Sequence, residues 1–190
     1  TLDQIQLLKE LDIENIHGTS SLNIFNSISV KFFRENCSLK KFEYSNELNI
    51  SQLRKILKGG QLQVFGTMEL MILEHCIPGA QLGTGSCKKT ILALKDRLDF
   101  EFPILVDELG KNHILNSKIL MLTDEMAELK KLGFNSFILN FVFREIEELL
   151  TVGGLYQKYL EDKIDTDSLR ESLNQNMSNY TKGHYSRGVL

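Results

Sequence analysis

Apolar positions recur along the chain in short blocks, some with a helical period and others with the length of a strand. The first block predicts a helix over residues 3–11, followed by a short strand at 13–17. A second helix is predicted over 22–36, with Ser20 or Ser21 as its N-cap. The apolar positions expected to form its buried face are Leu22, Phe25, Ile28 and Phe32.

The same strand and helix pattern repeats in the next block. A strand is predicted at 39–44, a helix begins at Ser51, the Gly59-Gly60 pair ends it, and the next strand covers 62–65. Strands that alternate with helices of about ten residues are typical of βαβ units with a parallel sheet. The fold class predicted from this pattern is therefore α/β.

Closely spaced apolar runs then predict a small β-rich insertion near 91–122. Helices are expected over 123–132, 145–160 and 166–176, with a strand at 137–141 between the first two. The Gly153-Gly154 pair predicts a break inside the second of these helices, because each glycine costs about 1 kcal/mol relative to alanine. The last twelve residues, NYTKGHYSRGVL, have no period and are expected to form a loop or an exposed tail.

Composition narrows the class of protein. With 190 residues, 42% hydrophobic and 25% charged, the chain fits a single domain or half-domain over 1–190. It has no apolar run of membrane-spanning length and no signal-peptide pattern, so a cytoplasmic protein without membrane contact is expected. The net charge of −3 does not predict strong nonspecific binding to nucleic acid. Because the first residue is Thr, the chain is expected to be a piece of a longer protein.

The stretch from Gly66 to Ser117 concentrates residues with special chemistry. It holds Cys76 and Cys87, separated by a glycine-rich segment, and an odd total of three cysteines favours thiols or metal ligands over a disulfide framework. The third cysteine, Cys37, is expected to pack in the core as a small apolar residue.

Carboxylates supply the candidate catalytic groups. Glu47 ends a predicted strand, where barrel folds place working side chains, and its alternative role is to cap or pair with the following helix. Asp96 and Arg97 form a second candidate, and their alternative role is to close a turn by an internal ion pair. The chain contains no HExxH, no GxSxG and no local Cys-His signature of a thiol protease, so no known hydrolase template is present.

The C-terminal segment supplies candidate substrate contacts. His184 and Arg187 suit an anionic ligand such as a carboxylate or a phosphate, and Tyr185 adds aromatic surface. The alternative is an exposed, frayed end.

Six motifs in order along the chain resemble a known family. They are SLNIFNS at 21–27, YSNELNISQLRKI at 44–56, GTMELMILEHC at 66–76, LKDRLDFEFPI at 94–104, ILNSK at 114–118 and TKGHYSRGV at 181–189. Together they are similar to the collagenase-like peptidases of family thirty-two of the U class, whose mechanism is unassigned. The resemblance implies a (β/α) TIM-barrel-like domain, of which this chain is expected to be the later half.

Three functional hypotheses follow, of which the resemblance implies the first two. The first is a peptidase. The second is a component of oxygen-independent hydroxylation of RNA or quinone, with an iron–sulfur cluster. The third is a non-catalytic barrel half that pairs with a missing N-terminal half or a partner chain. Half a barrel exposes sheet edges, so a homo- or hetero-oligomer is expected, with protein or RNA as substrate.

The resemblance also places Cys76 and Cys87 where cluster-binding members carry cysteines. A cluster typically needs four thiolates, and the segment DELGKNHILN at 107–116 contains no cysteine. The ligand set is therefore incomplete unless His75, His113 or a missing segment contributes, and no cofactor is assigned.

Overall fold

The computed structural model describes residues 1–83, 92–142, 144–175 and 179–186. The α-helices of this part are α1 (Leu2–Glu10), α2 (Ser27–Glu35), α3 (Ile50–Lys55), α4 (Ile77–Leu82), α5 (Met126–Lys131), α6 (Ile146–Leu160) and α7 (Thr166–Asn174). The strands are β1 (His17–Gly18), β2 (Lys41–Phe42), β3 (Leu62–Gly66), β4 (Glu69–Leu73), β5 (Leu92–Lys95), β6 (Glu101–Val106), β7 (Asn112–Leu115), β8 (Ile119–Met121), β9 (Phe137–Asn140) and β10 (Tyr180–Thr181).

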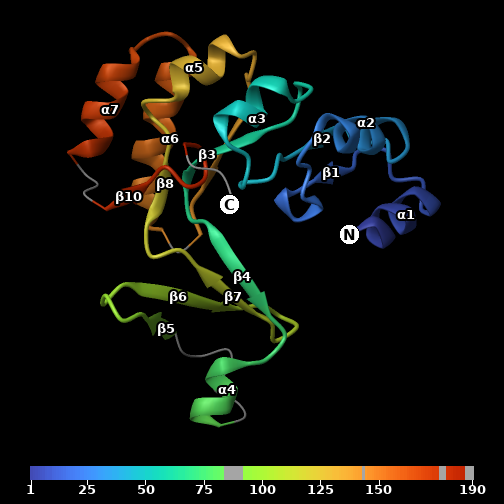
Figure 1. Ribbon diagram of the computed structural model, residues 1–190, viewed down its shortest axis with the longest axis vertical. Helices are drawn as coiled ribbons and strands as arrows, with labels where there is room; N and C mark the ends of the chain where they lie inside the picture. The colour runs from blue at the N-terminus through green and yellow to red at the C-terminus, as the bar shows by residue number, and fades with distance from the viewer. Residues whose placement is uncertain (84–91, 143, 176–178, 187–190) are drawn as a thin grey trace.

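Four strands run parallel and adjacent, in the order β1, β2, β3, β9. β1 pairs with β2, a parallel bridge joins Glu43 to Gln61 at the start of β3, and β3 pairs with β9. Helix α2 connects β1 to β2, and α3 connects β2 to β3 (Figure 1). The predicted βαβ units are therefore present, and the protein is a mixed α/β structure. The described strands do not close into a barrel.

The main sheet has a second, mixed part beside β3. β8 lies antiparallel to the end of β3, and β10 lies parallel to β8, so the four-stranded order is β10-β8-β3-β9. The C-terminal segment is thus part of the sheet. We call residues 180–186 the strap, because they run from β10 across to the start of α3, where the Ile50 N–H donates to the Tyr185 carbonyl over 2.9 Å. The expectation of a frayed tail is wrong for these residues.

A separate antiparallel sheet extends from the end of β3. Its strand order is β4-β7-β6-β5, and α4 follows β4 at its far end (Figure 1). We call β4, α4, β5, β6 and β7 the arm. The arm begins at Glu69, earlier than the insertion predicted near 91–122, and β8 belongs to the main sheet instead. Ile104 and Ile114 are buried in the arm, outside the main hydrophobic cluster of the described residues.

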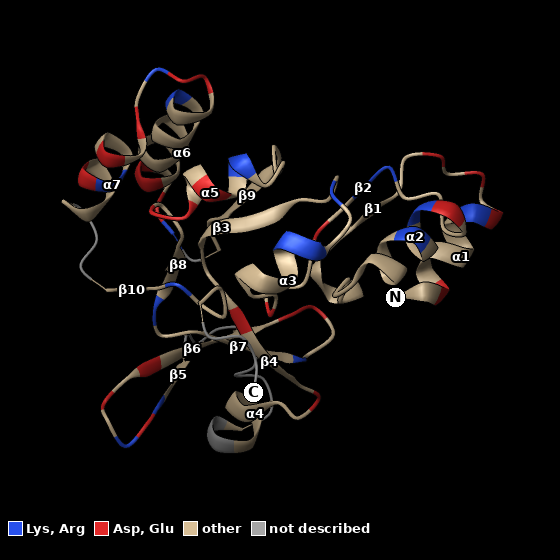
Figure 2. Cartoon of the chain, turned by 45° about the horizontal axis from the view of Figure 1, so that its top comes forward, with Lys and Arg blue, Asp and Glu red and all other residues tan. Residues whose placement is uncertain are grey.

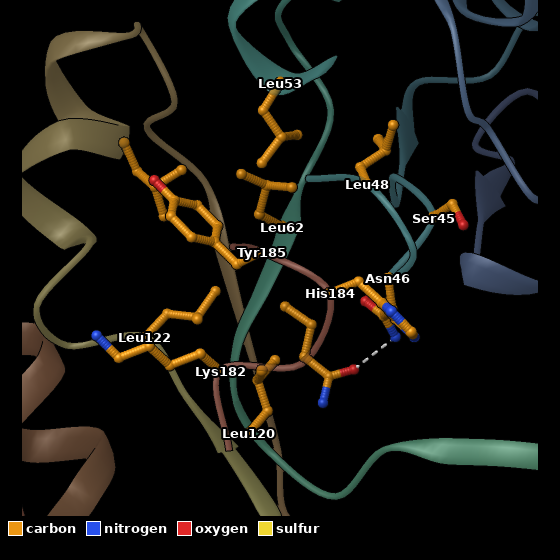
Figure 3. Close-up of a pocket in the computed structure, with 12 residues that line it drawn as sticks. Ser45, Asn46, Leu48, Leu53, Leu62, Leu120, Leu122, Lys182, His184 and Tyr185 are labelled. Atoms are coloured by element: carbon orange, nitrogen blue, oxygen red, sulfur yellow. Dashed lines mark hydrogen bonds between the residues drawn. The ribbon is translucent and has the colours of Figure 1, made fainter. Parts of the chain in front are cut away.

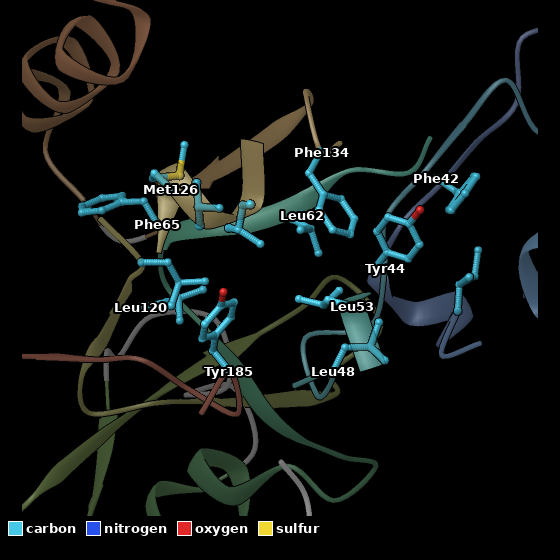
Figure 4. Packing of buried hydrophobic residues seen from close by; sticks show 14 of the residues in the cluster. Phe42, Tyr44, Leu48, Leu53, Leu62, Phe65, Leu120, Met126, Phe134 and Tyr185 are labelled. Carbon is cyan, nitrogen blue, oxygen red and sulfur yellow. The ribbon is translucent and has the colours of Figure 1, made fainter. Parts of the chain in front are cut away.

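The main core is continuous from the N-terminal strands to α6 and α7. Aromatic rings link its parts: Tyr44 packs edge-on against Phe42 and against Phe134, with centroids 5.3 and 5.7 Å apart (Figure 4). Further along, Phe65 packs against Tyr156 of α6. Cys37 is buried in this cluster, as expected for a small apolar residue.

Helix α2 begins later than predicted. Its N-cap is Asn26, whose side chain accepts a hydrogen bond from the Ser29 N–H, whereas residues 20–22 form a single 3₁₀ turn that Asn23 ends in the left-handed region. The buried face is therefore Val30 and Phe33, and the predicted face position Ile28 is 79% exposed. Likewise Asn49, in a capping box with Gln52, starts α3 in place of the predicted Ser51.

Helix α6 is unbroken over its 15 residues, so the predicted break at Gly153-Gly154 is wrong. Val152, Tyr156 and Tyr159 are all buried on one face of this helix. Burial of two tyrosine rings and a valine stabilises the helix by more than the two glycines cost. None of the helices in the described part is long and apolar enough to cross a bilayer.

Candidate functional site

The strap, the turn after β2 and strands β3 and β8 enclose a small cavity of about 30 Å³. Polar groups and leucines share its wall (Figure 3): Ser45, Asn46, Leu48, Leu53, Leu62, Gln63, Leu120, Leu122, Leu129, Lys182, His184 and Tyr185. This volume holds one or two water molecules but no substrate side chain. Two of the predicted substrate contacts, His184 and Tyr185, are therefore at one place.

The polar wall comes from the residues that follow β2. The Asn46 amide nitrogen donates to the Gln63 side-chain oxygen over 3.1 Å, and Gln63 in turn donates to the Thr67 carbonyl over 2.8 Å (Figure 3). These bonds orient the Asn46 amide and leave it a second N–H. Figure 3 shows His184 next to Asn46.

Tyr185 forms the apolar wall and anchors the strap. Its ring is 7% exposed, and its hydroxyl donates to Glu128 over 3.2 Å, while Arg54 pairs with the same carboxylate at 2.6 Å. Burial, and then the Glu128 charge, raise the pKa of Tyr185 above its ordinary value. Tyr185 therefore stays a neutral hydroxyl at physiological pH.

Lys182 carries the strongest ion pairs of the strap. Its ammonium lies 2.6 Å from a Glu125 carboxylate oxygen and 3.0 Å from Asp124, and Arg170 approaches Asp124 at 3.4 Å. The hydrogen bond to Glu125 is the main cause of the raised pKa of Lys182, and Lys182 is the main cause of the lowered pKa of Asp124. Because two carboxylates already neutralise the Lys182 ammonium, its charge does not attract an anionic ligand.

Glu47 lies between two residues of the cavity wall but is not itself a wall residue. Its neighbours Asn46 and Leu48 line the wall, and its own N–H donates to the Ser45 hydroxyl over 3.3 Å. The Glu47 side chain is exposed, and its carboxylate makes no hydrogen bond or ion pair within the described part of the chain. The alternative of a helix cap is not observed, because Asn49 caps α3.

Asp96 and Arg97 lie elsewhere, in the exposed turn between β5 and β6 of the arm (Figure 1). The Asp96 carboxylate accepts the backbone N–H groups of Leu98 and Phe100 at 2.7 and 3.0 Å, so it organises the turn through the backbone. The structure does not bring this pair to the cavity. Their assignment to catalysis stays a prediction, and the proposal below does not use them.

Cys76 is also on the arm, as the N-cap of α4. Its sulfur accepts the Gly79 N–H at 3.3 Å, and the buried Asn112 side chain fixes the same loop by donating to the His75 carbonyl over 2.9 Å. Cys87 and Arg187 lie outside the described residues. Within 1–83, 92–142, 144–175 and 179–186, no three His, Cys, Asp or Glu side chains gather as metal ligands. The described residues therefore do not form a cluster site, and we derive no step that uses one.

Several wall residues were not predicted as site residues: Ser45, Asn46, Gln63 and Lys182. Ser45 and Asn46 directly precede Glu47 at the end of the second parallel strand, and that position was their signal in the sequence. Lys182 lies two residues before His184, but nothing in the sequence pointed to its partners Asp124 and Glu125, just before α5.

The arrangement is that of an α/β protein with a water-sized cavity at the end of a parallel strand. Leucines and a few polar groups line the cavity, and the unengaged Glu47 carboxylate is adjacent in sequence to two of them. The chain belongs to peptidase family U32, whose family model matches residues 4–190. No curated protein and no solved structure matches the chain.

Proposed function

We propose that the cavity between the strap and the turn after β2 is the hydrolytic site of a peptidase. The observation that supports it most is a water-sized cavity whose wall residues Asn46 and Leu48 flank the exposed Glu47, in a chain of a peptidase family. The substrate peptide lies across the mouth of the cavity, because the cavity itself is too small for it.

In this proposal Glu47 is the general base. It takes a proton from the water that attacks the peptide carbonyl, and the same proton then passes to the leaving amine. The second Asn46 N–H and the His184 ring are the groups nearest to the developing negative charge on the carbonyl oxygen, where hydrogen-bond donors stabilise the transition state. Tyr185 forms the wall behind them.

The test is cleavage of gelatin and of a quenched fluorescent peptide by the purified chain and by Glu47→Gln. Removing a general base typically costs 10²–10⁴-fold in rate, so we expect a loss of at least about 100-fold. Glu14→Gln, which changes an exposed carboxylate remote from the cavity, is the matched control and keeps full activity. Unchanged cleavage by Glu47→Gln removes Glu47 from the mechanism, and no cleavage by the unchanged chain overturns the peptidase proposal.

A second proposal concerns architecture. We infer that the parallel strands β1, β2, β3 and β9 are half of a (β/α) barrel, because β1, β2 and β9 are each followed by a helix. The outer edges of β1 and β9 have no partner strand among the described residues. The first turns of α6, which follows β9 in the chain, expose Ile146, Leu149 and Leu150. Open strand edges and an exposed apolar helix face support the expectation of a partner chain.

A further inference from the structure

We infer that Lys182 is the positioning residue of the cavity: its ion pairs to Asp124 and Glu125, just before α5, fix the strap so that His184 lies next to Asn46 and Tyr185 forms the apolar wall. The catalytic consequence of this inference rests on the proposed function. The docking of the strap is independent of the proposed function and has its own measurement.

The backbone alone holds the strap weakly. β10 has only two residues, Tyr180 and Thr181, and both pair with β8. Beyond them, the hydrogen bond from the Ile50 N–H to the Tyr185 carbonyl is the main backbone link to α3. A single hydrogen bond contributes little net stability, so side chains must supply much of the docking.

Lys182 supplies the contact that is hardest to replace. The Glu125 side chain is only 10% exposed, and its second carboxylate oxygen is buried with no hydrogen-bond partner within the described chain. The carboxylate therefore depends on the Lys182 ammonium at 2.6 Å. A buried charge that loses its partner is strongly unfavourable, so Glu125 holds Lys182, and with it the strap, in place.

Gly183, the residue after Lys182, sets the direction in which the chain continues. Gly183 has φ +55, and an added Cβ would lie 3.2 Å from Leu120 and 3.3 Å from Met68. Its N–H donates to the Thr181 hydroxyl over 3.1 Å, which closes the turn. The chain therefore bends tightly against β8 directly after the anchored lysine, and this bend carries His184 toward Asn46.

The first measurement is amide hydrogen exchange of residues 180–186. Lys182→Met keeps the apolar stem and removes the charge, and we expect the strap amides to exchange at least 10-fold faster. Lys182→Arg restores slow exchange, since a guanidinium can reach both carboxylates. Lys163→Met, which removes the exposed ion pair with Glu161, is the matched control and leaves the strap unchanged. Unchanged strap exchange in Lys182→Met overturns the inference.

The second measurement is peptide cleavage. A mispositioned His184 lowers kcat more than it raises KM, and Lys182→Arg recovers most of kcat. If Lys182→Met does not fold, the double variant Lys182→Met with Glu125→Gln removes the uncompensated buried charge. The same exchange measurement is then made on this double variant. Inactivity of the unchanged chain counts against the peptidase proposal alone. Equal kcat in Lys182→Met and the unchanged chain, with a loosened strap, overturns the catalytic consequence of the inference.

Discussion

His113 has a carboxylate at each of its ring nitrogens. Its Nδ1 contacts Glu69 at the start of β4, and its Nε2 lies 3.4 Å from Asp107 in the turn between β6 and β7. Both nitrogens must carry a proton to donate to both carboxylates. The bond to Glu69 is the main cause that raises the pKa of His113 above its ordinary value of about 6.5.

This raised pKa predicts a pH dependence of the arm. The bound proton stabilises the folded state fully below the ordinary histidine pKa, and the stabilisation is lost as pH rises through the raised pKa. We expect the free energy of unfolding to decrease as the pH rises from about 6.5 through the raised pKa of His113. The variant His113→Gln should lack this decrease. Denaturant titrations at several pH values measure it. The prediction is contradicted if the free energy of unfolding changes equally with pH in His113→Gln and in the unchanged protein.

At the level of single residues, the sequence indicated which residues of the strap lie together but not that the strap begins as a strand of the sheet. His184 and Tyr185 were expected to bind together, and the structure brings them to one cavity, because they are adjacent in a segment with flanking glycines. Glu47 was predicted from its place at the end of a strand, and Asp96 with Arg97 as a second such candidate, but the structure places Glu47 after β2 and Asp96 in the arm. Pairings such as Lys182 with Glu125 join segments 57 residues apart, and no local pattern encodes them.

At the scale of helices and strands, two glycines give opposite predictions. Gly66 ends β3 with φ +104, and an added Cβ would lie 1.8 Å from the Asn140 carbonyl oxygen of β9. Gly153 is inside α6, and an added Cβ would meet nothing within 4 Å. Gly66→Ala therefore strains the β3–β9 pair and costs about 3 kcal/mol. Gly153→Ala stabilises α6 by about 1 kcal/mol.

Thermal unfolding of the two variants measures this contrast. For a chain of this size, about 1 kcal/mol corresponds to about 2–4 °C in Tm, so Gly153→Ala unfolds slightly above the unchanged protein and Gly66→Ala well below it. Equal Tm values for Gly66→Ala and the unchanged protein contradict the close approach of β3 and β9.

The existence of most helices and strands was predictable from apolar periodicity, but their ends were not. Asn26 and Asn49 cap α2 and α3, whereas serines were expected, because the side chain that accepts the N3 N–H depends on the preceding turn. The continuity of α6 was missed because tertiary burial of Tyr156 outweighs glycine propensity.

At the scale of the whole molecule, the open edges of β1 and β9 and the apolar face at the start of α6 predict association. We expect light scattering to give a mass above the 21.8 kDa of one chain, or to do so after a partner is added. Leu149→Lys together with Leu150→Lys places charges on the exposed face and shifts the protein toward the monomer. A stable monomer of the unchanged chain that binds no partner contradicts this prediction.

The α/β class and the parallel βαβ order followed from the sequence, since alternating helices and strands leave few topologies. The sequence predicted only part of the arm. Its first strand, β4, is continuous in sequence with the core strand β3 after only two residues, and nothing local marks the change of sheet. Figure 2 shows acidic and basic residues interspersed over the elements drawn, consistent with the small net charge.

The strap has a consequence for synthesis of the protein. One wall of the cavity is made at residues 45–48 and the other at 182–185, so the second wall is translated long after the first. A nascent chain that stalls before residue 180 can form β1, β2 and β3, but it has only half a cavity. Under the proposed function, chains that end before the strap lack one wall of the site and are inactive, so activity arises only after the strap has been translated.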